Sequence, residues 1–303
     1  MNKGDKTKKT DWQSRTAVLT HGAGNLPLIS IENRFATCLI YTYGAHIASF
    51  QPKGEKDLLF VSPHSRFESG QPIRGGIPLC FPWFGKHPTR TDLPLHGVVR
   101  TQNWVLSSIV DEDDGSTTVV LTTTDDDQTY LVWPFHFSLT LTVIVAKSLT
   151  MILEVENTDT TSFLFEEAFH TYFAIGGLPS CIVEGLDGLT VLDRTKNDLQ
   201  SKQEGPVAVA GEFVKVYKHA GPSVSLIDKE LDRIIKMKQT QFKHIVIWNP
   251  GNDAAMLNPE IKEAWKSFMC VEQTNCLDAA VTLQSGVTHT SSLTLSVLSR
   301  QGI

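Results

Sequence analysis

The sequence contains no apolar run that approaches the ~18 residues a membrane-spanning helix needs. Residues 1–10 are polar and include no apolar segment, so we expect neither a secretory signal nor a membrane partner. Basic residues are not in excess, since 27 lysines and arginines stand against 33 acidic residues and the net charge is −6. Binding to a nucleic-acid backbone needs a basic face, so we expect no nucleic-acid partner, although a local cationic pocket for one phosphate fits this balance.

Cysteine is scarce, and its arrangement argues against two common scaffolds. The cysteines are odd in number and no Cys-x-x-Cys pair occurs, so we expect neither a disulfide framework nor a structural zinc site. We predict reduced, mostly buried thiols in a cytoplasmic protein. The five residues are Cys38, Cys80, Cys181, Cys270 and Cys276.

No internal repeat, low-complexity linker or compositional break divides the chain of 303 residues. Hydrophobic residues make up 41% and charged residues 20%, which supplies a large core and argues against wholesale disorder. All-β domains often reach this size as single units. We therefore predict one domain over residues 21–303, preceded by a polar tail over residues 1–20.

Patterns of period two dominate the sequence. Alternation of apolar and polar side chains puts one face of a strand on a core and the other toward water or a second layer. Such strands recur at short spacing with turn residues between them, which predicts an all-β antiparallel sandwich. The clearest examples are residues 116–124, 137–145, 151–157 and 292–298.

Helix signals are few. Residues 258–266 are expected to form a short helix, with Asn258 as its cap and Pro259 at its first position. The acidic stretches Asp111–Gly115 and Asp125–Asp127 are expected to be solvated hairpin turns, because they lack the ligand spacing of a calcium loop.

Two proton-transferring side chains, His170 and Glu272, lie in apolar runs far apart in the chain. A buried titratable group is costly unless it is paired or used, so two of them suggest an acid and a base facing one site. An imidazole exchanges protons near neutral pH, and burial raises the pKa of a carboxyl group toward that of a useful base. The alternatives are a core histidine held by one backbone hydrogen bond and a strand-end glutamate facing solvent.

A cation lies on a glycine-rich turn, where Arg74 precedes Gly75 and Gly76, residues that let the backbone approach a ligand closely. Arg100 follows shortly after His96. Two guanidinium groups grip a dianion through paired N–H bonds, so these arginines are candidates for an anion pocket, with ordinary surface salt bridges as the alternative. His96 either donates a hydrogen bond to a sugar oxygen or caps a turn.

Together these segments resemble the hexose-6-phosphate mutarotases, also called glucose-6-phosphate 1-epimerases, of the aldose 1-epimerase superfamily. The resemblance runs from about Ile31 to the C-terminus. The motifs that carry it, in the family's order, are Ile73–Pro78 with Phe81–Gly85, His96–Gly97 with Arg100, Trp133–Phe135 with Phe137, Phe169–Phe173, Trp248–Gly251 and Cys270–Glu272.

The resemblance implies a galactose-mutarotase-like β-sandwich, or supersandwich, with one open cleft. It implies an isomerase that interconverts the α and β anomers of hexose 6-phosphates, glucose 6-phosphate first among them, by acid–base ring opening and closure. His170 is then the general acid and Glu272 the general base, while Arg74, His96 and Arg100 bind the substrate. This chemistry needs no metal, nucleotide or redox cofactor, and we expect a monomer whose partner is the small sugar phosphate.

Two positions depart from the family pattern. In many members a Thr-Asp-Arg-Val-Tyr stretch supplies a sugar-binding aspartate, and here the corresponding stretch is Phe213–Tyr217, with Val214 at that position. Valine accepts no hydrogen bond from a hydroxyl group. Leu95 stands where some members carry a glutamine, and Asp193 matches a different family aspartate, for which a structural role is expected.

Two other functions are considered beside the first. A mutarotase for unphosphorylated aldoses would leave the guanidinium groups of Arg74 and Arg100 with nothing to neutralise. A non-catalytic sugar-phosphate-binding module on the same fold is favoured by Val214. The presence of both His170 and Glu272 argues against that module, because binding alone does not need an acid–base pair.

Overall fold

The structure, a computed structural model, describes residues 14–299. Its longest sheet has nine strands, which are β6 (Val105–Asp111), β7 (Thr117–Thr124), β8 (Phe137–Val145), β9 (Leu149–Asn157), β13 (Cys181–Glu184), β16 (Val207–Ala208), β18 (Ser223–Asp228), β19 (Arg233–Thr240) and β23 (Thr288–Ser299). They pair antiparallel in the order β16-β13-β18-β19-β23-β9-β8-β7-β6. Buried and less buried side chains alternate along β7, β8 and β9, which confirms the strands that the period-two patterns predict.

A second sheet has eight strands, which are β5 (Leu79–Cys80), β11 (Glu167–Phe169), β12 (Tyr172–Ala174), β14 (Thr190–Asp193), β15 (Leu199–Lys202), β17 (Phe213–Lys218), β20 (His244–Asn249) and β21 (Phe268–Asn275). Its order is β15-β14-β17-β20-β21-β11-β5, and β12 also pairs with β21. Every residue of β21 is buried, because this strand lies in the middle of the sheet and both of its faces are covered.

Two smaller sheets complete the strand structure. A four-stranded sheet pairs β1 (Ala17–His21), β2 (Pro27–Glu32), β3 (Ala36–Tyr41) and β4 (His46–Pro52) in chain order, and β10 (Phe163–Phe165) pairs with β22 (Val281–Leu283). The predicted tail over residues 1–20 is wrong at its end, because Ala17 to His21 form a ladder with β2. The rest of that tail, up to residue 13, lies outside the described residues. The single domain stays a prediction.

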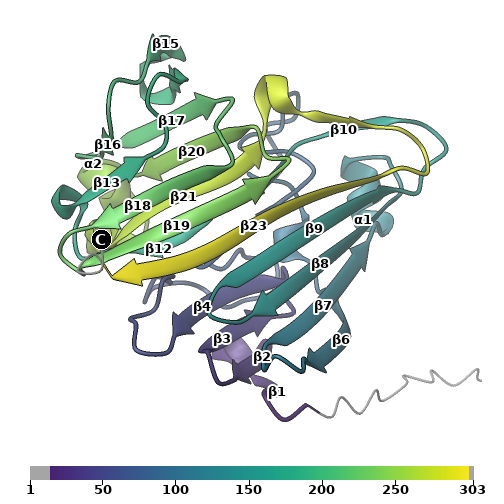
Figure 1. Cartoon of the computed structure of the whole chain (residues 1–303). Coiled ribbons are helices and arrows are strands. Elements are labelled where there is room, and N and C mark those ends of the chain that lie inside the picture. Colours follow the sequence, from purple (N-terminus) through teal and green to yellow (C-terminus); the bar gives the residue numbers. More distant parts are fainter. Residues whose placement is uncertain (1–13, 300–303) are drawn as a thin grey trace, which may run out of the picture.

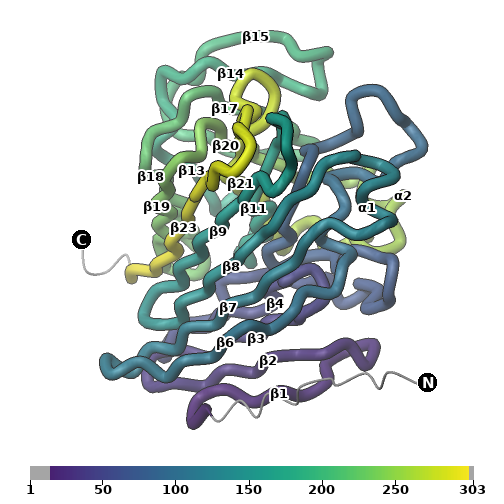
Figure 2. Tube along the Cα trace, turned by 90° about the vertical axis from the view of Figure 1, so that its right-hand side faces the viewer, coloured from purple at the N-terminus to yellow at the C-terminus, as the bar shows by residue number. Residues whose placement is uncertain are grey.

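The nine-stranded sheet packs against both of the other large sheets, one toward each of its ends. Figure 1 shows β17, β20 and β21 beside β18, β19 and β23, while Figure 2 shows β1–β4 together at the opposite end, next to β6–β9. One continuous cluster of buried side chains takes members from all three of the larger sheets, for example Ile29, Leu141 and Ile245. The antiparallel β-sandwich is therefore confirmed, with one long layer covered by two shorter ones.

Helices are short. They are α1 (Asp127–Val132), α2 (Gly251–Leu257) and the 3-10 turns η1 (Ala23–Asn25), η2 (Val99–Thr101), η3 (Leu178–Ser180), η4 (Arg194–Lys196), η5 (Lys262–Ser267) and η6 (Leu277–Ala279). No helix among the described residues has the length and apolar character to cross a membrane.

The helix expected over residues 258–266 is wrong. Asn258 does accept a hydrogen bond from the backbone N–H of Glu260, at 3.0 Å, but α2 has already ended before it. Lys262 then takes a φ of +46°, which an α-helix cannot contain, so the chain continues as η5. Of the acidic stretches, Asp111–Gly115 does lead through a hairpin turn, whereas Asp126 caps α1.

A long connection between β4 and β6 lies over the eight-stranded sheet and holds only β5 and η2 as regular elements. Gly75 has a φ of +118°, and a Cβ there would lie 2.3 Å from the backbone oxygen of Phe60. At Gly76 a Cβ would lie 2.4 Å from the backbone oxygen of Ile47. The close approach seen at this turn is to neighbouring backbone, and at Gly76 it holds the connection against β4.

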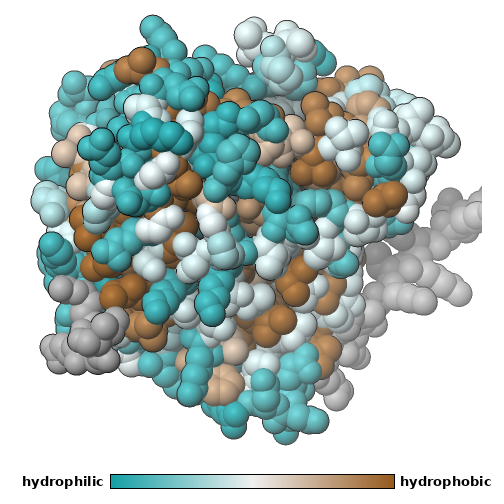
Figure 3. All heavy atoms as spheres, turned by 45° about the horizontal axis from the view of Figure 1, so that its top comes forward, coloured by the Kyte–Doolittle hydropathy of each residue, from teal (hydrophilic) through white to brown (hydrophobic). Residues whose placement is uncertain are grey.

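The exterior carries no large continuous apolar area on the face that Figure 3 shows, where brown residues form separate small groups among teal and white ones. Exposed large hydrophobic residues such as Leu131 and Leu257 are scattered over different elements. All five cysteines are buried and free, as the sequence predicts.

Candidate active site

The site is built on β21, whose side chains alternate between two faces. Met269 and Val271 join the central core, whereas Cys270 and Glu272 project from the other face of the strand. A cavity of about 890 Å³ lies over that face. All five site residues predicted from the sequence line this cavity, namely Arg74, His96, Arg100, His170 and Glu272.

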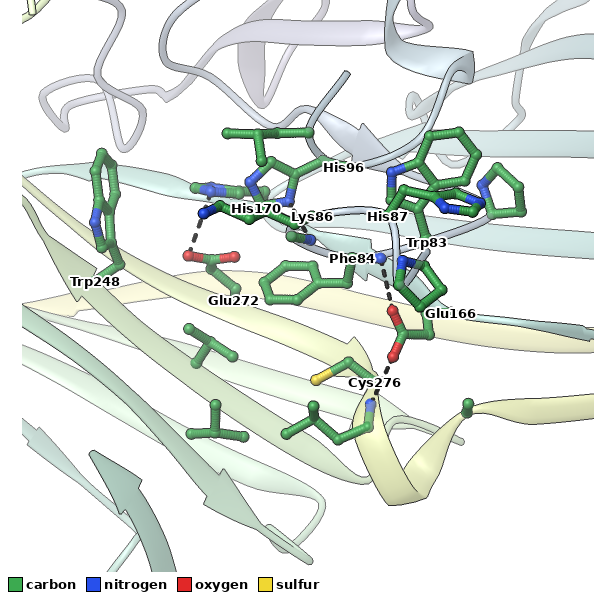
Figure 4. A pocket seen from close by; sticks show the side chains of 18 of the residues that line it. Trp83, Phe84, Lys86, His87, His96, Glu166, His170, Trp248, Glu272 and Cys276 are labelled. Carbon is green, nitrogen blue, oxygen red and sulfur yellow. Dashed lines mark hydrogen bonds and ion pairs between the residues drawn. The ribbon is translucent and has the colours of Figure 1, made fainter. Parts of the chain in front are cut away.

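His170 and Glu272 face each other in this cavity (Figure 4). The Nε2 atom of His170 lies 3.4 Å from Oε1 of Glu272, and both side chains are almost fully buried. His170 lies between β11 and β12, and both of these short strands pair with β21. Its backbone N–H donates to the carbonyl of Pro78 at 3.0 Å, and its ring stacks on Tyr172 with centroids 4.9 Å apart. The imidazole is thus positioned by a backbone hydrogen bond and by the ring stacked on its face.

Burial sets the protonation of this pair. It lowers the pKa of His170 to about 3, with further lowering by the positive charges of Arg100 and Arg74. It also raises the pKa of Glu272 well above its usual value, against the opposing effect of Arg100. Both shifts favour the uncharged forms, a neutral imidazole and a protonated carboxyl group. The imidazolium expected from the sequence is one proton transfer away, between two atoms 3.4 Å apart.

The two arginines reach the cavity from separate turns of the long connection. Arg74 donates to the hydroxyl group of Tyr172 at 3.5 Å and to Oε2 of Glu260 at 3.4 Å. Arg100 donates from Nη2 to the carbonyl of Leu95 at 2.6 Å. The Nε–H groups of both arginines are buried and have no hydrogen-bond partner, which is the condition expected of donors that await an acceptor. Arg74 and Glu260 thus form a partly buried ion pair, whereas Arg100 forms no ion pair with the residues that the structure describes.

His96 holds a turn, which is one of the two roles that the sequence leaves open. It has a φ of +65°, its backbone N–H donates to the carbonyl of Gly85 at 2.7 Å, and its Nδ1 accepts from the N–H of Gly85 at 3.2 Å. Burial, then the charges of His170, Arg100 and Arg74, lower its pKa well below the usual value. With Nδ1 as the acceptor, the neutral ring carries its proton on Nε2, which makes it a hydrogen-bond donor.

Three further residues support the site and were not identified from the sequence. Tyr172 links the ring of His170 to Arg74, and Glu260 holds Arg74 from the segment before η5. Glu166 accepts from the N–H of Phe84 at 2.8 Å and from the N–H of Leu277 at 2.7 Å, so one carboxylate joins two loops at the cavity (Figure 4). Tyr172 is two positions after His170, which was a usable signal; nothing in the sequence marks the two glutamates.

One wall of the cavity is apolar. Val214 and Val216 of β17 line it together with Val246 and Trp248 of β20, and Leu95 lines it from the long connection. Both positions that depart from the family pattern thus lie in the cavity.

Asp193 does not line this cavity. Its carboxylate accepts from the backbone N–H of Thr195 at 3.1 Å and lies 3.7 Å from Nζ of Lys215. It caps the turn η4, as the expected structural role requires.

Sequence comparison relates the chain to known proteins over nearly its whole length. The aldose 1-epimerase family profile matches residues 27–296. A protein of Escherichia coli K12 with the name "Putative glucose-6-phosphate 1-epimerase" is 31% identical over 251 residues, which is 82% of this chain and 82% of that protein.

Structural comparison agrees. The crystal structure of YeaD from Salmonella typhimurium superposes with a TM-score of 0.88 at 26% identity, covering 95% of this chain and 96% of that one. A galactose mutarotase related enzyme from Lactobacillus acidophilus superposes with a TM-score of 0.72 at 14% identity, covering 90% of this chain and 98% of that one. The second likeness concerns the fold alone, and together the two confirm the galactose-mutarotase-like sandwich.

Proposed function

The chain belongs to the aldose 1-epimerase family, and from this premise we propose that it interconverts the α and β anomers of hexose 6-phosphates, with glucose 6-phosphate as the first substrate to test. One observation carries the proposal. An imidazole and a carboxyl group lie 3.4 Å apart in a cavity whose lining also includes the guanidinium groups of Arg74 and Arg100. The first pair suits proton transfer at a sugar ring, and the second pair suits a dianion.

Ring opening requires two coupled proton transfers. Glu272, as carboxylate, accepts the proton of the C1 hydroxyl group, while His170, as imidazolium, donates a proton to the ring oxygen as the C1–O5 bond breaks. The open aldehyde rotates about C1–C2 and closes on its other face with the roles reversed. Each positioned transfer contributes about 10²- to 10⁴-fold. His96 carries a proton on Nε2 and is available to hold a hydroxyl or ring oxygen during the rotation.

The phosphate has two effects in this scheme. Held by Arg74 and Arg100, it fixes the orientation of the sugar relative to the acid and the base. It also neutralises the two charges that lower the pKa of His170. A bound dianion therefore favours the imidazolium form of His170, the form that donates the proton, and weakens the effect by which Arg100 lowers the pKa of Glu272.

The test is anomer exchange followed by NMR. Pure α-glucose 6-phosphate is dissolved with the protein and without it, and the approach of the anomeric signals to equilibrium is timed. We expect faster exchange with the protein and loss of the acceleration in Glu272→Gln, which keeps the shape of the side chain but removes the base. Free α-glucose is the parallel substrate.

Three outcomes separate the candidate functions. Faster anomer exchange of glucose 6-phosphate, without faster exchange of free glucose, supports the proposal. Acceleration of free glucose without its phosphate would instead indicate a mutarotase of neutral aldoses. Binding of the sugar phosphate with no acceleration would indicate a non-catalytic module, the function that the apolar wall around Val214 favours.

A further inference from the structure

A cysteine completes a cluster of ligand-type atoms around the acid–base pair. Cys270 and Glu272 are two positions apart on β21, so their side chains project from the same face. Each of Cys270, His170 and Glu272 offers one atom, and these three atoms lie within 4.8 Å of one another. The proposed reaction uses the imidazole and the carboxyl group but leaves the thiol without a role.

Polar atoms in this cluster have unused bonding capacity. Oε2 of Glu272 and Nδ1 of His170 are buried and have no hydrogen-bond partner. A buried polar atom without a partner is costly, so such an atom in a folded protein indicates strain, a chemical role, or a bound water or ion. Glu272 is 1% exposed, and its carboxyl group contacts the cavity, which gives an ion a path to the cluster.

We propose that His170, Cys270 and Glu272 form an inhibitory binding site for a thiophilic divalent cation such as Zn²⁺. Zinc bonds of about 2.0–2.3 Å to nitrogen, oxygen and sulfur put two ligands of a tetrahedral ion roughly 3.3–3.6 Å apart. The His170–Glu272 separation of 3.4 Å already falls in that range. The three atoms lie within 4.8 Å of one another, so the sulfur needs an inward movement of at most about 1.5 Å, and a water molecule from the cavity supplies the fourth ligand.

Charge selects the kind of cation. Arg74 and Arg100 line the same cavity and repel a bare cation. Cys270 and Glu272 release their protons to water as the ion binds, and the resulting thiolate and carboxylate together balance a divalent ion, so the complete complex adds no net charge beside the guanidinium groups. Thiolate and imidazole ligands favour Zn²⁺ and Co²⁺, whereas Mg²⁺ and Ca²⁺ prefer oxygen ligands. We therefore expect the site not to bind Mg²⁺ or Ca²⁺.

Occupation of this site blocks the proposed reaction, because the ion takes both groups that move protons. That consequence rests on the proposed function, whereas the binding itself does not. The ion and glucose 6-phosphate then compete for the same two side chains, and added sugar phosphate raises the concentration of Zn²⁺ needed for half inhibition.

The binding test uses Co²⁺ as a spectroscopic probe on the full, metal-free chain. Tetrahedral Co²⁺ with a thiolate ligand gives intense visible bands and a sulfur-to-cobalt charge-transfer band in the near ultraviolet. We expect both to saturate at one equivalent, to disappear when Zn²⁺ is added, and to be unaffected by excess Mg²⁺. Absence of the charge-transfer band in the wild-type protein would overturn the proposal.

Two cysteine variants give a matched comparison. Cys276 is buried as Cys270 is, and it lines the cavity, but it is not part of the cluster. Cys270→Ser should lose the charge-transfer band and weaken Zn²⁺ binding by at least about 100-fold, since even outer contacts of a metal site are worth 10- to 100-fold. Cys276→Ser should keep the charge-transfer band and the wild-type affinity for Zn²⁺. An unchanged band in Cys270→Ser would contradict the assignment.

A second variant and a second readout keep the test decisive. If Cys270→Ser fails to fold, as judged by its melting curve, Glu272→Gln removes the carboxylate instead and should weaken Co²⁺ binding with the sulfur band retained. Cobalt binding through Cys270 in a protein that does not accelerate anomer exchange would leave the metal site standing and remove the proposed function. Accelerated anomer exchange without cobalt binding would support the proposed function and overturn the metal site.

Discussion

The rings of His170 and Tyr172 lie nearly parallel, with centroids 4.9 Å apart and an interplanar angle of 14°. The hydroxyl group of the same tyrosine accepts a hydrogen bond from Arg74 at 3.5 Å. One aromatic side chain therefore contacts both the proton-transferring group and the cationic group of the proposed site. Its ring and its hydroxyl group serve different parts of that site, and single substitutions separate them.

Tyr172→Phe keeps the stacked ring and removes only the contact with Arg74. We expect KM for glucose 6-phosphate to rise about 2- to 10-fold, the value of one hydrogen bond of about 0.5–1.5 kcal/mol, with kcat nearly unchanged. Tyr172→Leu also removes the stacking on His170 and should lower kcat as well. Steady-state anomer exchange rates measure both constants, and a fall in kcat without a change in KM for the phenylalanine variant would refute this division.

Arg74→Ala should damage the reaction of the phosphorylated sugar selectively. A hydrogen bond to a charged group is worth about 1.5–3 kcal/mol, so kcat/KM for glucose 6-phosphate should fall roughly 10- to 100-fold, while any activity on free glucose stays the same. The matched control is Arg194→Ala, because Arg194 also lines the cavity and also pairs with a carboxylate, that of Asp198 at 2.9 Å, but its side chain is more exposed than that of Arg74. Equal losses for both sugars would count against the anion pocket.

Glu167 should be a major contributor to stability although it lies outside the active site. It is fully buried and accepts hydrogen bonds from Asn275 at 2.8 Å, His289 at 2.9 Å and Ser291 at 3.2 Å. Glu167→Ala leaves all three donors without an acceptor and should lower the free energy of unfolding by about 3–5 kcal/mol. Urea denaturation measures this, with Glu156→Ala on the exposed face of β9 as a control that should change little.

The ion pairs of Asp278 should make a pH-dependent contribution to the stability of the fold. Its carboxylate lies 2.5 Å from Nζ of Lys218 and 3.0 Å from Nε2 of His244, and these contacts, that of Lys218 first, lower its pKa to about 2 from 3.8. A lowered pKa means that the stabilisation is complete above the unfolded-state value near 4 and is lost as pH falls toward 2. The side chain is half exposed, so the effect is small.

The comparison for Asp278 is with Asp278→Asn, by thermal unfolding between pH 2 and pH 6. The wild-type protein should be more stable at pH 6, and the two melting curves should converge at pH 2. High salt should also reduce the difference, since exposed charges are screened within about 3 Å at 1 M. A difference that stays constant over this pH range would show that the carboxylate does not act through its charge.

The strands were predictable because their signal is local. Along β8 and β9 every second side chain is buried, and that alternation is visible in residues 137–145 and 151–157 without knowledge of any partner. The helix expected after Asn258 shows the limit of such signals. A favourable cap and a proline at the first position do not start a helix where the backbone is turned by a positive φ, here at Lys262.

The site residues were identified by type and by the order of the motifs, while their meeting depends on pairing between distant segments. His170 reaches Glu272 because β11 and β12 both pair with β21, a contact across about a hundred positions that no local pattern encodes. Tyr172 and Glu260 acquire their roles only through Arg74.

By itself, the sequence determined an antiparallel sandwich, reduced cysteines and the family to which the chain belongs, because alternation, composition and motif order are properties of the chain read along its length. Tertiary structure alone decided the directions in which the pKa values of His170 and Glu272 are shifted and the position of Cys270 beside them. Those depend on burial and on charges brought in from remote segments, and the strength of both is set by distance in space.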